Sequence, residues 1–387
     1  MYTQETKYEP SHTIRQSNLF AIDNDKVIEV HSIFTVVQNN GHETDSFEEQ
    51  LNRLKAAYSS WCTEKKSTNS TLFIRFFVSD IANQASFIQS KDFANCAISI
   101  VQQPPLAYHT KVSMWCYDII GQNIVSDGVF HFFQNNGYTH YWTANRCLTE
   151  GDSAFQTHRL LETYEEDLTK ADIQFADNCI RTWFFVQNVD VNYQGVVKGR
   201  KENFETIGLT QDTHYIASTG IEGRTVQPSS YVLLDAYAVK GLQKGQQQYL
   251  YAKEHLNPTY EYGVTFERGV KVMYGDRDHL YISGTASINN KGEVMYVGDI
   301  KKQTFRMMEN VEALLHEGEA EVSDIAICII YLRDMADYQT VKKIIDESAF
   351  KTCAKTFVLA PVCRPTWLIE MECIAIRANK NEKYKNF

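Results

Sequence analysis

The sequence predicts an α/β (α+β) fold built from three similar units in one chain. Three observations predict it. The chain has 387 residues, too many for one ordinary domain; similar helical segments recur along it; and each is followed by strands and a second helix in the same order. With 43% hydrophobic and 22% charged residues, the chain can bury a large core.

The repetition is clearest in two helical segments. FQTHRLLETYEEDL at 155–168 aligns without gaps with KQTFRMMENVEALL at 302–315, and six of the fourteen positions are identical. Apolar residues recur at helical spacing in both, which predicts amphipathic helices. A weaker third copy, FEEQLNRLKAAYSSW, lies at 47–61. The alternative to a true repeat is chance similarity between amphipathic helices.

Each helix precedes the same series of elements. The predicted elements are apolar strands beginning at Ile74, Ile180 and Ile327, second helices at 82–93, 191–207 and 335–349, and closing strands at 112–119, 232–239 and 369–376. Agreement in order and spacing favours a repeat of whole units. We therefore expect a degenerate unit at 18–120, a second degenerate unit at 121–242 and a best-preserved unit at 258–378.

Turn-forming residues mark the connections between elements. Hairpin turns are predicted at 38–41 (QNNG), 136–137 (NG) and 289–292 (NNKG). The polar stretch 241–248 (GLQKGQQQ) is expected to be a linker, and the tail 379–387 is expected to be frayed.

Charge and composition disfavour several classes of partner. The net charge is −10 and no Lys/Arg block exceeds a doublet, which disfavours nucleic-acid binding. The longest apolar run, 325–332, is too short to span a bilayer. The first twenty residues lack the apolar region of a secretory signal, and the nine cysteines show no CxxC spacing. We expect reduced thiols and a cytoplasmic protein.

The motifs of metal and cofactor sites are missing from the sequence. The eleven histidines form no HxH or HExxH pair, and no cysteine pair has zinc-site spacing. There is no GxGxxG, GxxxxGK[ST] or GxSxG segment. The prediction is a protein without a metal or a cofactor.

The closing strand of the third unit carries a distinctive pair of acids. Glu370 and Glu372 are two residues apart, so in a strand they share one face. A carboxylate on so apolar a strand is costly unless it is paired, exposed or used. The matching positions to Glu370 are Ser113 and Leu233, so only one of three equivalent strands has the acid. This asymmetry favours one surviving site, although a solvated strand face is the alternative.

The third unit resembles the RidA/YjgF family. The matching stretches are 279–315 (HLYISGTASINNKGEVMYVGDIKKQTFRMMENVEALL), 329–338 (IIYLRDMADY) and 368–376 (LIEMECIAI). Members of that family are small α/β proteins that form trimers with ligand sites between subunits. The resemblance therefore implies a pseudo-trimer in a monomeric chain. Imine-hydrolysing members have an arginine fifteen residues before a strand glutamate, where this sequence has Lys355.

A longer pattern is similar to the chorismatases, especially those that form hydroxybenzoates. Its pieces are 181–183 (RTW), 217–221 (ASTGI), 283–288 (SGTASI) and 363–365 (CRP), and they cover the second and third units. The resemblance implies conversion of chorismate into pyruvate and a hydroxybenzoate, with the 3-isomer favoured. It also implies that Glu370 is the proton donor, and Glu372 is the alternative because it shares the face.

The same resemblance implies a set of substrate-binding residues. Arginines that grip the substrate carboxylates are expected at Arg181 and Arg268, with Arg200 as a further candidate. Tyr215 would donate a hydrogen bond, Gly284 and Ala286 would let the ring approach the backbone, and Cys363 would favour the aromatic product. Without the resemblance, a strand arginine is more often in a surface ion pair, and a buried tyrosine or cysteine usually packs in the core, while Gly284 and Ala286 fit tight strand packing equally well.

Two other functions remain open at this point. A RidA-like deaminase would act on reactive enamines or imines, and a non-catalytic member would only bind a small molecule, because the fold hosts many functions.

Overall fold

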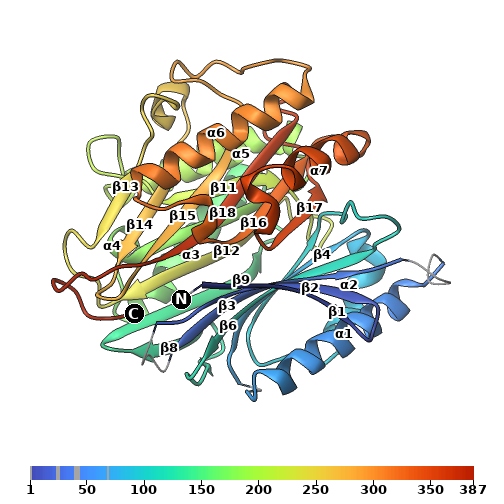
Figure 1. Cartoon of the computed structure of the whole chain (residues 1–387). Coiled ribbons are helices and arrows are strands. Elements are labelled where there is room, and N and C mark those ends of the chain that lie inside the picture. Colours follow the sequence, from blue (N-terminus) through green and yellow to red (C-terminus); the bar gives the residue numbers. More distant parts are fainter. Residues whose placement is uncertain (1, 23–26, 39–43, 68) are drawn as a thin grey trace.

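The computed structural model contains three six-stranded sheets, and helices cover their outer faces (Figure 1). The structure describes residues 2–22, 27–38, 44–67 and 69–387. Each sheet has the same strand order, so the predicted threefold repeat and the α+β class are confirmed.

The elements of the first unit are β1 (Tyr2–Glu9), β2 (Thr13–Phe20), β3 (Ile28–Val36), α1 (Phe47–Glu64), β4 (Thr71–Val78), α2 (Ile81–Gln89), β5 (Ala97–Gln102) and β6 (Val112–Ile120). Those of the second are β7 (Val125–Ser126), β8 (His131–Asn135), β9 (Tyr138–Cys147), α3 (Ser153–Lys170), α4 (Phe175–Asn178), β10 (Cys179–Val186), α5 (Val189–Thr206), β11 (Ala217–Glu222) and β12 (Val232–Lys240). Those of the third are β13 (Gln247–Leu250), β14 (Gly269–Met273), β15 (Arg277–Ala286), α6 (Ile300–Glu317), β16 (Ile325–Leu332), α7 (Tyr338–Asp346), β17 (Lys355–Leu359) and β18 (Ile369–Ala378), with short 3₁₀ helices at Thr259–Tyr262, Val322–Asp324, Met335–Asp337 and Ala349–Thr352.

The sheet order explains why each closing strand is so apolar. In the third unit the order is β13-β14-β15-β18-β16-β17, so β18 lies inside the sheet and pairs on both sides. Helix α6 packs against it from outside, and the other two units cover its inner face. The predicted helices and closing strands are confirmed. The strands β5, β11 and β17, each parallel to the strand before it, were not predicted.

Several boundaries differ from the predictions. The first sheet includes β1, which lies before residue 18, and the third includes β13 (Gln247–Leu250), which occupies part of the expected linker. The tail is not frayed, because the Phe387 ring is buried against His140 and His279. The turns at 136–137 and 289–292 are confirmed, whereas most of 38–41 lies outside the described residues.

The three units close a ring. In each interface an edge strand of one unit (β5, β11 or β17) touches a loop of the next through an antiparallel β-bridge: Gln102↔Arg224, Ile221↔Val362 and Val358↔Pro105. The contacts therefore run from the first unit to the second, from the second to the third, and from the third back to the first. Such head-to-tail contacts close a ring in cyclic trimers, and the chain is a pseudo-trimer.

Each interface also buries an ion pair. Arg75 of the first unit lies 2.8 Å from Asp235 of the second, Arg181 of the second lies 2.7 Å from Glu372 of the third, and Arg277 of the third lies 2.9 Å from Glu29 of the first. A buried charge that loses its partner is strongly destabilising, so these pairs favour one relative placement of the units.

Helix α5, which carries residues to the cavity described below, sits unusually close to α3. Gly195 and Gly199 lie one turn apart at this contact. A Cβ atom at Gly199 would be 2.2 Å from the Ala154 carbonyl oxygen, and one at Gly195 would be 2.1 Å from Ser153 Oγ. The helices therefore approach each other at a distance that only glycine permits.

We predict that Gly199→Ala lowers the free energy of unfolding by roughly 1–3 kcal/mol, because the methyl group overlaps a backbone atom and forces α5 outward. Urea unfolding followed by circular dichroism measures the change. Lys198→Ala, on the exposed side of the same helix, is the control and should stay within about 0.5 kcal/mol of the wild type. Equal stability of Gly199→Ala and the wild type would contradict the close contact.

Candidate active site between the second and third units

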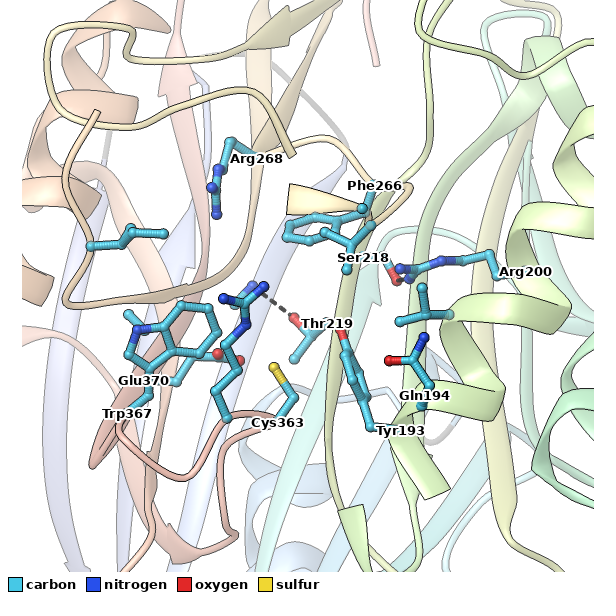
Figure 2. Close-up of a pocket in the computed structure, with 18 residues that line it drawn as sticks. Tyr193, Gln194, Arg200, Ser218, Thr219, Phe266, Arg268, Cys363, Trp367 and Glu370 are labelled. Carbon is cyan, nitrogen blue, oxygen red and sulfur yellow. Dashed lines mark hydrogen bonds between the residues drawn. The ribbon is translucent and has the colours of Figure 1, made fainter. Parts of the chain in front are cut away.

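A cavity of about 410 Å³ lies between the second and third units. One wall comes from α5 and β11 of the second unit, and the other from β15, β18 and the loop before β18 of the third. In Figure 2, Tyr193, Gln194 and Arg200 lie on one side, and Cys363, Trp367 and Glu370 on the other. The lining residues are Tyr193, Gln194, Val197, Arg200, Ser218, Thr219, Gly220, Gly263, Val264, Phe266, Arg268, Gly284, Ala286, Ile288, Cys363, Arg364, Trp367 and Glu370.

Glu370 is the buried acid of this cavity. Its residue is only 5% exposed, and burial together with the nearby Glu372 carboxylate raises its pKa to about 8, although Arg268 and Arg181 oppose the shift. The carboxyl group packs against Gly284, where a Cβ atom would lie 2.1 Å from Glu370 Oε1. Gly284 therefore provides the space that the carboxyl group occupies. A neutral carboxyl group is available in this cavity at neutral pH.

Glu372 has a different environment from Glu370 and does not line the cavity. Arg181 Nη2 donates to its Oε2 at 2.7 Å, Trp183 Nε1 donates to its Oε1 at 2.9 Å, and the Thr219 hydroxyl also donates to Oε2. Arg75 Nη1 lies 4.0 Å from Glu372 Oε1. These donors occupy both oxygens of Glu372, so the geometry favours Glu370 over Glu372 as a proton donor.

Three arginines line the cavity: Arg200, Arg268 and Arg364. Arg200 donates to the hydroxyls of Thr265 and Ser218, and Arg268 donates to oxygens of Asn257. Arg364 lies over the Trp367 ring, with its guanidinium carbon 5.1 Å from the ring centre. The acceptors of Arg200 and Arg268 named here are neutral oxygens, and an anionic ligand would be a stronger acceptor.

Two of the predicted binding residues are elsewhere. Arg181 does not line the cavity, because its guanidinium is engaged by Glu372. Tyr215 lines a neighbouring cavity of about 340 Å³, which shares Gly263 and Val264 with the first. The other predicted residues, Arg268, Gly284, Ala286, Cys363 and Glu370, all lie at the first cavity.

The aromatic walls of the cavity were not predicted from the sequence. Tyr193 on α5, Phe266 before β14 and Trp367 before β18 bring three rings to it. Arg364 was noted only as part of the CRP segment. These residues come from three separate segments whose sequences show no common pattern, so only their placement together reveals them.

Lys355 belongs to another part of the molecule. It lines a cavity of about 210 Å³ between the third and first units, together with Gln16 and Tyr338. The register of the parallel strands places Ser218 in the second unit where Lys355 stands in the third. The residue that corresponds to Lys355 on the wall opposite Glu370 is therefore Ser218.

The described residues were also compared with what a metal site and a membrane-spanning helix require. No group of three or more His, Cys, Asp or Glu side chains among them is placed to hold a metal ion. None of the described helices has the length and apolar character needed to cross a membrane. All nine cysteines are free thiols.

Known proteins resemble the third unit in sequence. The profile of the Endoribonuclease L-PSP family matches residues 266–377. A RutC family protein from Pyrococcus abyssi is 32% identical over 100 residues, which are 25% of this chain and 78% of the relative. The chain belongs to the RutC family. The predicted RidA/YjgF-like relationship is thereby confirmed.

Other comparisons extend this relationship. The RutC relatives include the 3-aminoacrylate deaminase RutC of Acinetobacter baylyi, 28% identical over 97 residues, which are 25% of this chain and 77% of the deaminase. A solved chorismatase structure superposes with a TM-score of 0.62 and covers 79% of this chain and 93% of its own. The two chains are 16% identical, so the superposition shows that they share a fold.

The raised pKa of Glu370 predicts a pH-dependent difference in stability. Between pH about 4.5 and about 8 the unfolded chain ionises at this residue while the folded chain stays neutral, so the wild type loses stability as pH rises. Glu370→Gln escapes this loss. Its stability relative to the wild type should rise with pH across that window, by at most about 1.4 kcal/mol per pH unit, and then level off. Denaturant unfolding at a series of pH values measures the difference, and a difference independent of pH would contradict a buried neutral Glu370.

Proposed function

We propose that this protein is a chorismatase, which releases pyruvate from chorismate and forms a hydroxybenzoate, with 3-hydroxybenzoate favoured. The observation that carries the proposal is a buried carboxyl group with a raised pKa, Glu370, in a cavity that also holds three arginines. The shared fold with a chorismatase supports it. No cofactor takes part in this chemistry.

The substrate's charge and shape fit the cavity lining. Chorismate is a dianion with two carboxylates, and arginine guanidinium groups bind carboxylates through paired hydrogen bonds. Arg200, Arg268 and Arg364 are the candidates to receive them. Its ring would lie among the side chains of Tyr193, Phe266 and Trp367. The small residues Gly284 and Ala286 let that ring come close to β15.

Glu370 would act as a general acid. Its proton goes to the terminal methylene carbon of the enolpyruvyl ether, which leaves an oxocarbenium ion and a Glu370 carboxylate. Water adds to that cation, the bond between the ether oxygen and the pyruvyl carbon breaks, and pyruvate leaves together with a dihydroxy-cyclohexadiene acid. Loss of the C4 hydroxyl and the C3 ring proton as water then gives 3-hydroxybenzoate, so the water that was consumed is returned. Arg268, which lowers the pKa of Glu370, stabilises the carboxylate that forms. Hydrolysis to a dihydroxy acid consumes one water, whereas benzoate and pyruvate together contain the atoms of chorismate.

We expect the purified protein to release pyruvate from chorismate, measured with a coupled lactate dehydrogenase assay. Glu370→Gln should lower kcat by about 10²–10⁴-fold, because a general acid contributes this much. Asp118→Asn, a buried substitution in the first unit, is the control for general damage and should keep most of the activity. Wild-type protein that releases no pyruvate would reject the proposed function.

The thiol of Cys363 is placed to influence the product. Burial raises its pKa to about 12, so it is a neutral group in the wall of the cavity beside Tyr193 and Glu370. Cys363→Ala should increase the dihydroxy acid at the expense of the benzoate, measured by chromatography of the products. Cys353→Ala, outside the cavity, should leave the ratio unchanged. An unchanged ratio in Cys363→Ala would remove this role and leave the pyruvate-releasing activity intact.

A deaminase is the second candidate because the RutC relatives include one. Against it, Lys355 lies in a different cavity, and Ser218 stands at the corresponding register in the cavity that holds Glu370. Ammonia release from 3-aminoacrylate without pyruvate release from chorismate would favour the deaminase. Binding of either compound without turnover would favour a non-catalytic member.

A further inference from the structure

Two buried carboxyl groups lie close together on β18, but their hydrogen-bond donors differ. Glu370 and Glu372 occupy the same face of the strand, and they are 5% and 4% exposed. Three donors from the second unit clamp Glu372: the Arg181 guanidinium, the Trp183 indole N–H and the Thr219 hydroxyl. Glu370 has no such set of donors among the described residues, although it faces the cavity.

Thr219 connects the two acids physically. Its hydroxyl donates to Glu372 and accepts a hydrogen bond from the Gly284 N–H at 2.9 Å. Gly284 is the residue against which the Glu370 carboxyl group packs, and Thr219 also lines the cavity. The position of the Glu372 carboxylate and the position of the Glu370 carboxyl group are therefore set by the same short chain of contacts.

We propose that Glu372 is a positioning residue that acts through Glu370. Its side chain, clamped by the second unit, adds a fixed negative charge to the effect of burial, and the two together favour the neutral, proton-donating form of Glu370. This role goes beyond the proposed function and rests on it only for the effect on turnover. It also explains why the donors come from the neighbouring unit: only the assembled interface carries both acids in these states.

The charged and titratable groups around Glu370 determine in which direction the pH of its ionisation should move. Those that face it are Glu372 on its own strand, Arg181 on β10, Arg268 before β14, Tyr331 on β16 and Cys363 before β18, with Arg200 and Arg364 lining the same cavity. Glu372 is the anion in this set. Its removal leaves burial as the remaining cause that raises the pKa of Glu370, while Arg268 and Arg181 still favour the ionised form, so the pKa should fall.

The chain offers a closely matched control. Asp118 on β6 of the first unit is also a buried carboxylate, held by a cation, a tryptophan N–H and a threonine hydroxyl, namely Lys65, Trp61 and Thr71. It lies under α1, between helix and sheet of the first unit, and does not line the cavity. Asp118→Asn therefore removes the same charge from the same kind of clamp at a distance from Glu370.

The experiment measures the ionisation of Glu370 without substrate. The difference in unfolding free energy between Glu370→Gln and its parent protein is followed against pH in the wild-type, Glu372→Gln and Asp118→Asn backgrounds. We expect the difference to level off near pH 8 in the wild-type and Asp118→Asn backgrounds, and about one pH unit or more lower in Glu372→Gln. The same pH in all three backgrounds would overturn the proposal.

A second variant distinguishes this role from a structural one. Arg181→Gln removes the cation and leaves the Glu372 charge, so the Glu370 transition should move to higher pH, opposite to Glu372→Gln. If Glu372 had only a structural role, the pH of the Glu370 transition would be unchanged in both variants or would move in the same direction in both. Either result would overturn the proposal. Arg181→Gln also gives an answer if Glu372→Gln does not fold.

Turnover gives a separate reading. If the protein releases pyruvate from chorismate, the alkaline limb of the kcat–pH profile should move to lower pH in Glu372→Gln. It should stay at the wild-type pH in Asp118→Asn. If it releases none, the proposed function fails, but the substrate-free titration still tests the link between the two acids.

Discussion

The structure around the cavity depends on one constraint: two carboxyl groups are buried two residues apart on β18. They cannot both be charged at low cost unless both are paired. The second unit pairs only Glu372, through Arg181, Trp183 and Thr219, and leaves Glu370 to the cavity. The neutrality of Glu370 is thus a property of the interface between two units. The close approach of Gly284 and the glycine contact between α3 and α5 serve the same interface by bringing both walls to it.

The pseudo-symmetry of the ring explains why one interface differs from the others. The three interfaces have equivalent strands, but the positions that match Glu370 carry Leu233 and Ser113. Leu233 is apolar, and the Ser113 hydroxyl lies 3.4 Å from the Thr356 hydroxyl at the interface of the first and third units. Neither can donate a proton as a carboxylic acid does. The two other units therefore lack an equivalent acid: they bury β18 and supply the arginines near its second acid, and the second unit also forms one wall of the cavity.

Much of the architecture followed from local patterns. Amphipathic spacing predicted α1, α3 and α6, and apolar runs predicted β4, β10 and β16, because these elements bury a continuous face whatever their neighbours are. The short parallel strands β5, β11 and β17 escaped notice because their sequences are mixed and their pairing is non-local. The buried position of Phe387 was missed for a similar reason: its partners, His140 and His279, are distant in the sequence and belong to two different units.

For the candidate site, the sequence and its resemblance to known families pointed to Gly284, Ala286, Cys363 and Glu370 of the third unit, because these residues lie on or beside two strands with a recognisable pattern. In the second unit, Arg181 and Tyr215 were expected at the substrate but do not line the cavity, whereas the further candidate Arg200 does. Arg181 was expected to bind the substrate and Glu372 was the alternative proton donor, and only the tertiary structure revealed that they bind each other. The same holds for Tyr193 and Trp367, which meet from separate segments. The physical reason is that charge pairing and cavity walls depend on which surfaces are brought together, and residue spacing along one strand carries no information about its neighbour across an interface.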